Sequence, residues 1–497
     1  MVFANKEIIH KTKKIMIHLR FCITILVLFA SVTLIYAEGD MTVKVNPRLK
    51  YQTIEGWGAS LCWWAHMVGQ WDDDKKIDEV VDLITSPDKL NMNIFRYNIG
   101  GGDDPSHYST PNKPGHMVKG KGVRAEMEGF KASEKSGYDW SKDAGQRKIM
   151  LKIKEKRPDA VFEAFSNSPP YWMTFSGCAG GNDPADADNL KPEYYGQFCD
   201  YLIEVCKHYK DVYGIEFKTL EPFNESFSPF WNFMGSQEGC HFEPESQIKL
   251  LKILYPKLKA SGLKTVISAS DETNLSTLIT VLNKYIDDGE VLDMIGQINV
   301  HTYSGSDQER LSAGNLVKLT GKPFWQSETG QFERSGFTSN LFLAQKCFDD
   351  LRLMKPQAWL DWQVMEENND TWCTIRGSFA GETFAPNRNF YVRKQISSFI
   401  KQGYIIIDTD KSNFLAAIDP TGKELVLCCI NLTGEDKTVK CDLSSFTPVA
   451  PAELYMTSST MKCEKQNSVN IGDNGILEFN TQDHTITTAV IQVKPIN

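Results

Sequence analysis

Residues 216–225 read EFKTLEPFNE and residues 323–328 read PFWQSE, and these two stretches decide how the fold is interpreted. Each is a short β-rich run that ends in a glutamate, Glu225 in the first and Glu328 in the second. From about residue 53 to residue 365, similar runs alternate with amphipathic stretches in which apolar residues recur every three or four positions. This alternation is typical of a parallel sheet with crossover helices.

The sequence contains eight such β-rich runs, which predict a closed (β/α)₈ TIM barrel. The predicted strands are Glu55–Ser60, Asn93–Gly100, Ala160–Asn167, Glu216–Asn224, Lys264–Ser270, Gln297–Tyr303, Pro323–Glu328 and Gln357–Gln363, and helices are predicted at Lys75–Thr85, Gln146–Lys156, Pro192–Tyr209 and Ser246–Ala260. An open doubly wound sheet is the alternative, but it would favour a glycine fingerprint after the first strand. The only comparable run, Gly100–Gly102, follows the second strand and leads into two aspartates, which would repel a phosphate.

A different pattern begins after about Asn387, where short alternating runs are separated by turn residues. Asp419-Pro420-Thr421-Gly422 between two of these runs is a hairpin signal. We therefore expect an α/β chain with a catalytic barrel over residues 53–386 and an attached antiparallel β-sandwich over residues 387–497. All eleven Trp precede the sandwich, which favours a supporting role for it. The absence of a low-complexity linker in the sequence predicts a rigid, packed junction.

The N-terminus has the pattern of a leader. Basic residues from Lys6 to Arg20 precede the apolar run Phe21–Ala37, and the chain becomes polar at Glu38. This order is typical of a secretory signal peptide, here residues 1–37, with Met16 as an alternative start. A single membrane anchor is the alternative, because 17 apolar residues lie at the lower edge of spanning length. We expect a secreted, periplasmic or cell-surface protein without a membrane partner after cleavage.

The balance of charge excludes one large class of partner. The chain has 54 Lys and Arg against 63 Asp and Glu, a formal charge of −9, and loss of a basic leader makes it more acidic still. A general nucleic-acid binder needs a basic face to displace counterions from phosphates. We therefore expect no nucleic-acid partner, and a neutral or cationic partner suits the charge better.

The cysteines do not form a recognisable framework. Twelve are present, and removal of Cys22 with the leader leaves an odd number spread over the remaining chain. Neither a CxxC nor an HExxH motif occurs, so we expect no metal site and no cofactor. Most of the thiols are expected to be buried and free, with a pair or two bridged in an oxidising compartment.

Candidate catalytic residues follow from the barrel, because active groups lie at the C-terminal ends of its strands. Those ends carry Trp57, Gly58 and Ser60; Arg96 and Asn98; Ser166–Pro170; Asn224-Glu225; Asp271-Glu272; His301 and Tyr303; Ser327-Glu328; and Trp362. Aromatic faces stack on sugar rings, while Asn, Arg and His side chains bond to hydroxyl groups. Two carboxylates among such residues indicate acid/base chemistry on a sugar.

A glutamate at a strand end is often only a solvated residue or an ion-pair partner. Two of them on the fourth and seventh barrel strands, among many aromatics, favour a catalytic pair instead. Glu221 is the rival acid, because it lies four residues before Glu225 on the same face of the strand. Its deeper position predicts an internal ion pair, with Arg96 as the candidate partner.

Five stretches in chain order resemble glycoside hydrolase family 30. They are EGWGAS at 55–60, FRYNIGGG at 95–102, SNSPPYWM at 166–173, PFNE at 222–225 and WQSE at 325–328. The resemblance extends from about Thr42 to the C-terminus. It implies a barrel with the acid/base after the fourth strand and the nucleophile after the seventh. It also implies that an N-terminal strand within residues 38–52 enters the sandwich.

Carried over to this sequence, the resemblance implies that Glu225 is the general acid/base and Glu328 the nucleophile. Asn224 would hold the sugar 2-hydroxyl, and Arg96 would orient Glu328 or keep it ionised. Glu225 would need a pKa raised by burial beside Glu328. The carboxyl groups of such retaining enzymes are about 5–5.5 Å apart. The further residues expected to bind substrate are His301, Tyr303, Trp57, Trp172, Trp231 and Trp362.

Within the family, LCWWA at 61–65, SGC at 176–178 and WNFMGSQEGC at 231–240 resemble the endo-β-1,6-galactanase branch most. Members of that branch cut the β-1,6-galactan side chains of arabinogalactan. The resemblance thus implies a retaining endo-β-1,6-galactanase acting on a neutral polysaccharide or oligosaccharide. With the leader, we expect it to be a secreted monomer. Cys178 and Cys240 follow the two loops expected to flank the cleft, and a disulfide between them is a hypothesis.

Two alternatives remain open at this stage. Another family 30 β-glycosidase, acting on β-1,6-glucan, xylan or a glucosyl lipid, would share the same catalytic pair. A non-catalytic carbohydrate-binding protein on an inactive barrel is the alternative from a different class, and the presence of both Glu225 and Glu328 argues against it.

Overall fold

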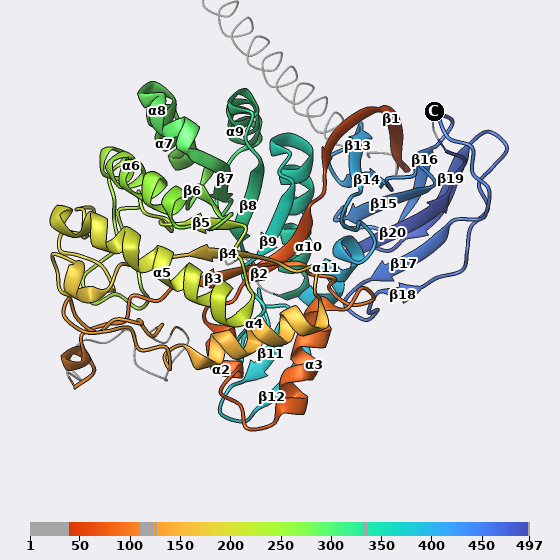
Figure 1. The fold of residues 1–497 in the computed structure, drawn as a ribbon. Helices are drawn as coiled ribbons and strands as arrows, with labels where there is room; N and C mark the ends of the chain where they lie inside the picture. The colour runs from red at the N-terminus through yellow and green to blue at the C-terminus, as the bar shows by residue number, and fades with distance from the viewer. Residues whose placement is uncertain (1–38, 110–123, 125–126, 332–335, 496–497) are drawn as a thin grey trace, which may run out of the picture.

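The computed structural model describes residues 39–109, 124, 127–331 and 336–495. Eight parallel strands pair in chain order, and the last pairs with the first to close a barrel (Figure 1). They are β2 (Gly56–Ser60), β3 (Ile94–Asn98), β4 (Val161–Phe165), β5 (Thr219–Glu221), β6 (Val266–Glu272), β7 (Ile295–His301), β8 (Phe324–Thr329) and β9 (Ala358–Asp361). Each predicted run overlaps one barrel strand, so the (β/α)₈ expectation is confirmed.

Helices cover the outside of the barrel (Figure 1). They are α2 (Trp64–Val68), α3 (Asp74–Thr85), α4 (Ala144–Lys156), α5 (Tyr195–Tyr213), α6 (Pro244–Ala260), α7 (Leu275–Asp288), α8 (Glu290–Met294), α9 (Asp307–Thr320), α10 (Gly336–Asp349) and α11 (Arg388–Ser397), with short helical turns η1 (Pro105–Ser109), η2 (Tyr171–Met173), η3 (Pro192–Tyr194) and η4 (Asp350–Met354). Local sequence sets their ends: the Asp73 side chain accepts from the backbone of Lys75 where α3 begins, and Ser306 with Glu309 forms a capping box on α9.

The second part of the chain is the predicted β-rich unit. Its strands run in the order β18-β17-β20-β15-β14-β13-β1-β16-β19. Their bounds are β1 (Met41–Thr53), β13 (Ile405–Thr409), β14 (Phe414–Ile418), β15 (Glu424–Asn431), β16 (Lys437–Asp442), β17 (Glu453–Thr457), β18 (Glu464–Lys465), β19 (Ile476–Thr481) and β20 (Thr485–Gln492). One pair departs from the antiparallel expectation, because β1 pairs antiparallel with β13 but parallel with β16.

The central strands of this large sheet, β14 and β15, are buried on both faces. Alternate side chains of β14 and β15, such as Phe414 and Cys429, pack in a core shared with β16 and β19. The intervening ones, such as Leu415 and Cys428, pack against α10, α11 and η4. Helix α11 therefore lies between barrel and sandwich (Figure 1). The continuous apolar cluster confirms the expected packed junction without a linker.

A small three-stranded sheet that the sequence analysis did not predict follows the last barrel strand. It consists of β10 (Met365–Glu367), β11 (Ile375–Ser378) and β12 (Thr383–Pro386), which are too short to show a clear alternation. Trp71, which follows α2, donates its indole N–H to the carbonyl of Phe379, 3.0 Å away, and stacks on Phe384. This sheet therefore closes one side of the barrel.

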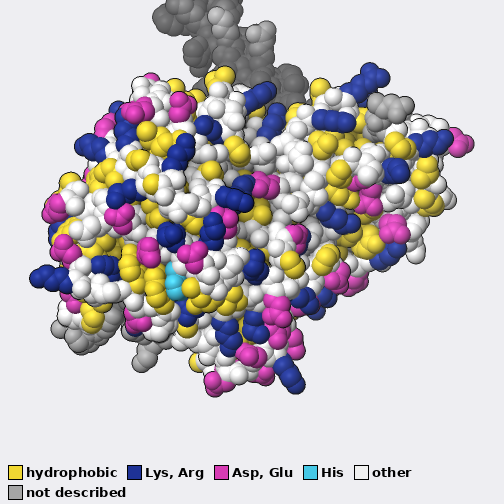
Figure 2. Space-filling model, viewed as in Figure 1, with side chains coloured by type: hydrophobic (Ala, Val, Ile, Leu, Met, Phe, Trp, Pro, Cys, Tyr) yellow, Lys and Arg dark blue, Asp and Glu magenta, His cyan; other side chains and the backbone are white. Residues whose placement is uncertain are grey.

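The leader predicted at residues 1–37 lies outside the described residues. Among the residues that are described, no helix is long and apolar enough to cross a membrane. Figure 2 shows acidic and basic side chains interspersed over the face in view, without a broad area of one sign.

Candidate active site

A pocket of about 450 Å³ opens at the C-terminal ends of the barrel strands. Its walls are largely aromatic and include Trp63, Phe230, Trp231, Tyr303 and Trp362. The rings of Trp63 and Trp362 meet edge to face, with their centroids 5.7 Å apart. Asn167, Asn224 and Gln237 add amide groups to the lining. Such walls offer both flat apolar faces and hydrogen-bonding groups. They are complementary to a sugar ring, which has apolar faces and hydroxyl groups.

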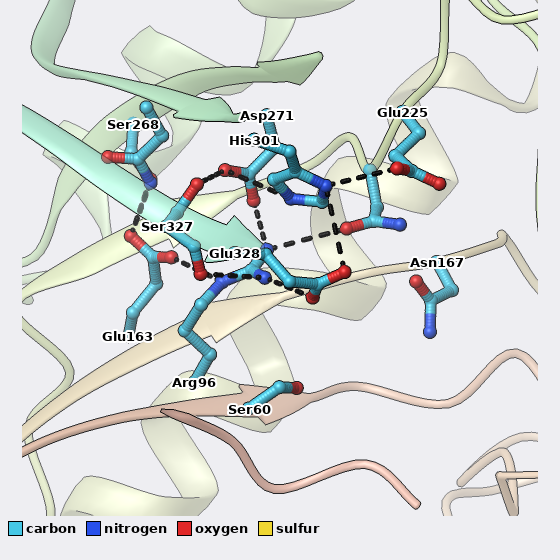
Figure 3. Close-up of polar contacts among 12 residues, drawn as sticks. Ser60, Arg96, Glu163, Asn167, Glu225, Ser268, Asp271, His301, Ser327 and Glu328 are labelled. Atoms are coloured by element: carbon cyan, nitrogen blue, oxygen red, sulfur yellow. Dashed lines mark hydrogen bonds and ion pairs between the residues drawn. The ribbon is translucent and has the colours of Figure 1, made fainter. Parts of the chain in front are cut away.

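Two carboxylates face each other across the floor of this pocket. Glu328 is part of β8, and Glu225 lies four residues beyond the end of β5. Their residues are only 6% and 8% exposed, respectively. His301, the last residue of β7, lies between them, and one oxygen of each glutamate is within 4.8 Å of the other (Figure 3).

Glu328 is held by two donors. One oxygen accepts a charge-assisted hydrogen bond of 2.9 Å from the Arg96 guanidinium. The other accepts from the Tyr303 hydroxyl, also at 2.9 Å. Burial and the neighbouring Glu328 and Glu225 charges raise the pKa of Tyr303 well above its ordinary value, so its hydroxyl keeps its proton. Both contacts fix the orientation of the Glu328 carboxylate.

Arg96 organises the polar floor beneath the pocket. Besides Glu328 it contacts Glu163 at 3.0 Å, Asp271 and, at 3.4 Å, the side-chain oxygen of Asn224 (Figure 3). Burial alone would lower the pKa of Arg96, but the surrounding carboxylates outweigh it and the pKa is raised. The ion pair expected between Arg96 and Glu221 is wrong. Asp271, Glu328 and Glu163 surround the guanidinium instead.

Glu225 has a different environment. Burial is the main cause that raises its pKa from 4.5 to about 7, while the Arg124 and Arg96 charges and a Thr273 hydrogen bond act in the opposite direction. Its backbone adopts a φ of +52°, which is costly for a residue with a side chain. That conformation is held by a 2.8 Å hydrogen bond from its N–H to the carbonyl of Asp271 and a 2.9 Å bond from the Trp231 indole to its own carbonyl.

His301 is fully buried between the two glutamates. Its Nδ1 is 3.1 Å from Glu225 and 3.6 Å from Glu328, and its Nε2 is 3.7 Å from Asp271. Burial lowers the pKa of His301 in spite of the nearby Glu328 and Asp271 charges. The imidazole is therefore neutral near pH 7. Depending on its tautomer, its Nδ1 can donate a hydrogen bond to Glu225 or accept one from it.

The structure brings together eight of the residues predicted for the site. Those that line the pocket are Asn224, Glu225, Trp231, Tyr303, Glu328 and Trp362, and Arg96 and His301 support them from below. The two nominated acids thus have opposite surroundings. Glu328 is bonded to a cation and a hydroxyl, whereas Glu225 is buried and readily protonated.

The placement expected for the other two tryptophans is wrong. Trp57 is 1% exposed, donates its indole N–H to the carbonyl of Ile400, 2.6 Å away, and packs in the junction with the sandwich. Trp172 lies outside the pocket lining, where its indole donates to the carbonyl of Lys131 and its ring meets Tyr194. Trp57 points away from the barrel axis, so its position near a strand end does not bring it to the cleft.

The Cys178–Cys240 disulfide hypothesis is also wrong. Both thiols are free and buried, as are most of the described cysteines. The Cys178 sulfur faces Asp103 and the N–H of Gly180, while Cys240 faces the carbonyl of His241. Their two loops are joined by backbone pairing instead, between Gly180 and Gly239.

The sequence analysis assigned no role to several residues of the pocket. Trp63, Asn167 and Gln237 line it, and Arg124 lies over the Trp63 and Trp362 rings with its centre 5.8 and 5.6 Å from their centroids. Trp63 and Asn167 fall directly after barrel strands, so their positions were a usable signal. Gln237 falls in the 231–240 stretch, whose loop was expected to flank the cleft, whereas nothing in the sequence around Arg124 marks its approach to the pocket.

A closed (β/α)₈ barrel with two buried acids after its fourth and seventh strands, under an aromatic pocket, defines the class of glycoside hydrolases. The comparisons with known proteins make this specific, because residues 40–291 match the model of O-glycosyl hydrolase family 30. The chain belongs to this family and is a glycoside hydrolase.

Individual proteins are similar to this chain over most of its length. An endo-β-1,6-galactanase of Hypocrea rufa is 29% identical over 422 residues, covering 82% of this chain and 84% of the relative. An exo-β-1,6-galactobiohydrolase of Bifidobacterium longum subsp. longum is 24% identical over 89% of this chain, which spans 38% of that longer protein. Among solved structures, a conserved exported protein from Bacteroides fragilis shares the fold, with a TM-score of 0.77 at 18% identity over 90% of this chain and 100% of that one.

Proposed function

We propose that this chain is a retaining endo-β-1,6-galactanase, with Glu328 as nucleophile and Glu225 as general acid/base. The observation that carries the proposal is the approach of the two carboxylates, with one oxygen of each within 4.8 Å of the other. Retaining glycosidases separate their carboxyl groups by about 5–5.5 Å, whereas inverting ones need roughly 6.5–9.5 Å to admit a water between acid and base. The short separation favours direct attack by Glu328.

In the first step, the Glu328 oxygen attacks the anomeric carbon while Glu225 gives its proton to the departing glycosidic oxygen. A C–O bond to Glu328 forms as the bond to the leaving sugar breaks. The contacts of Arg96 and Tyr303 with Glu328 orient the attacking carboxylate. Burial of Glu225 keeps it protonated close to neutral pH, as an acid requires.

In the second step, the departed sugar is replaced by water. Glu225, now a carboxylate, takes a proton from that water, whose oxygen attacks the anomeric carbon and releases Glu328. The product keeps the β configuration and Glu225 regains its proton. Neutral His301, 3.1 Å from Glu225, can hold a hydrogen bond to it in both states. Asn224, fixed by Arg96 at the pocket floor, is suited to the sugar 2-hydroxyl.

The proposed linkage and sugar are based on the names of the two relatives. Both curated relatives are named for β-1,6-linked galactose chains, and the one that aligns over most of its length is an endo-acting enzyme. We propose the β-1,6-galactan side chains of arabinogalactan as the substrate. Indole and phenol rings of the pocket would stack on the galactose rings, and binding a neutral polysaccharide needs no basic face.

The cellular setting and the domain limits are part of the proposal. We propose that residues 1–37 are removed on export, leaving a monomer that acts outside the cytoplasm, as the name of the exported structural neighbour suggests. Residues 53–386 would form the catalytic barrel, and residues 38–52 with 387–497 the supporting sandwich.

The decisive experiment compares wild type with Glu328→Gln on three polymers: debranched arabinogalactan, β-1,6-glucan and xylan. Reducing-sugar release from the galactan alone, lost in the variant, is expected. Activity on xylan alone would reassign the substrate, and no activity on any polymer would refute the enzymatic role. Proton NMR of early product should show the β-anomer, because double displacement retains it; α-product would mean inversion.

A further inference from the structure

A second cluster of ligating groups lies beside the pocket. Asp103, His107 and Cys178 bring one oxygen, one nitrogen and one sulfur atom within 4.8 Å of one another. The His107 Nδ1 is 2.9 Å from the Asp103 Oδ2, and the Cys178 sulfur is 3.8 Å from the same oxygen. Asp103 and Cys178 are buried, whereas the His107 side chain is 16% exposed, so an ion could enter from its side.

We propose that Asp103, His107 and Cys178 form a zinc site. Zinc takes carboxylate, imidazole and thiolate ligands in tetrahedral geometry, at about 2.0–2.2 Å for oxygen and nitrogen and about 2.3 Å for sulfur. Around one such ion the oxygen and nitrogen would be roughly 3.3 Å apart, and the oxygen and sulfur roughly 3.6 Å apart. The present separations of 2.9 and 3.8 Å differ from these by less than about half an ångström. A water would fill the fourth position.

Backbone groups orient the proposed ligands from behind. The other Asp103 oxygen accepts from the N–H of Ala179 at 3.0 Å, which leaves Oδ2 directed at the cluster. Burial and the Asp103 charge raise the pKa of the Cys178 thiol to about 12, and the N–H of Gly180, 3.2 Å from the sulfur, acts in the opposite direction. Binding would release the thiol proton to solvent as the zinc–sulfur bond forms.

The site would tie together the loops that wall the pocket. Asp103 and His107 follow β3, Cys178 follows β4, and the Gly180–Gly239 pairing joins them to the loop after β5. Gly180 and Gly235 are themselves part of the pocket lining. Zinc would therefore fix the shape of this wall without touching the substrate. This role is independent of the proposed galactanase activity.

The test is a Co²⁺ titration of the full metal-free chain, followed by displacement with Zn²⁺. One equivalent of Co²⁺ should produce a near-ultraviolet sulfur-to-cobalt charge-transfer band that Zn²⁺ removes, and Zn²⁺ should raise the unfolding temperature. Cys178→Ser should abolish the band, and His107→Gln should weaken Co²⁺ binding at least tenfold. Cys240→Ser, a buried thiol outside the cluster, is the matched control and should keep the band.

Other outcomes would overturn the site. No charge-transfer band in folded wild type would mean that the three residues form only a hydrogen-bonded cluster. A band that survives Cys178→Ser would place the thiolate elsewhere. Cobalt bound without a sulfur band would point to Glu225, His301 and Glu328, the other group of close ligating atoms among the described residues. If the Cys178→Ser variant does not fold, the His107→Gln variant still tests the zinc site, because the His107 side chain is partly exposed.

Discussion

Replacing Glu225 by glutamine is expected to stabilise the barrel in alkaline solution. In the folded chain, burial chiefly raises the pKa of Glu225 from 4.5 to about 7. Between these pH values the folded state holds a proton that the unfolded state has released, so the free energy of unfolding falls as the pH rises. At about 1.4 kcal/mol per tenfold change in acidity, the full loss is about 3 kcal/mol and is complete above pH 7. Glutamine cannot ionise, so the Glu225→Gln variant does not lose this stability as the pH rises.

The assay is urea unfolding of wild type and Glu225→Gln at pH 4 and pH 8, followed by tryptophan fluorescence. All eleven Trp lie between residues 57 and 372, so the signal reports the barrel. The stability of the variant relative to wild type should increase by about 3 kcal/mol from pH 4 to pH 8. Glu79→Gln, at an exposed site on α3, is the control and should show no such change. A relative stability of Glu225→Gln that stays constant across this range would refute the buried, proton-holding carboxyl.

Four further outcomes concern activity and stability. For wild type, kcat/KM on galactan should fall above about pH 7, because Glu225 must be protonated to act as an acid; a rate that stays flat to pH 9 would exclude it from that role. Tyr303→Phe removes one hydrogen bond to Glu328, worth about 1.5–3 kcal/mol for a charged acceptor, and should lower kcat roughly 10- to 100-fold. Trp57→Ala should cost about 3–5 kcal/mol of stability in urea unfolding. Trp362→Ala should instead mainly raise KM, and the reverse result for these two variants would contradict their placement.

The barrel could be predicted because its strands recur with regular helical stretches between them, and the two acids because each ends such a strand. The orientation of Trp57 could not be predicted in the same way. Every residue of β2 is buried, so the sequence lacks the polar alternation that would separate an inward from an outward side chain.

The ion-pair partners of Arg96 could not be predicted from the sequence either. Glu163, Glu221, Asp271 and Glu328 all lie on barrel strands, and the choice among them depends on the stagger of the barrel. That stagger includes register shifts within β6, β7 and β8 that no local pattern reveals. The pocket wall formed by Arg124 and Gln237 likewise depends on how long loops pair with one another.

The position of β1 has a consequence for how the chain folds. This strand precedes the barrel in the chain, yet its partners β13 and β16 begin more than 350 residues later. Closing so long a loop is slow, so β1 cannot be paired until the whole barrel polypeptide and the strands that follow it are available. We infer that the sandwich holds the two ends of the barrel polypeptide together. A nascent or truncated chain that lacks β13 and β16 would leave β1 unpaired.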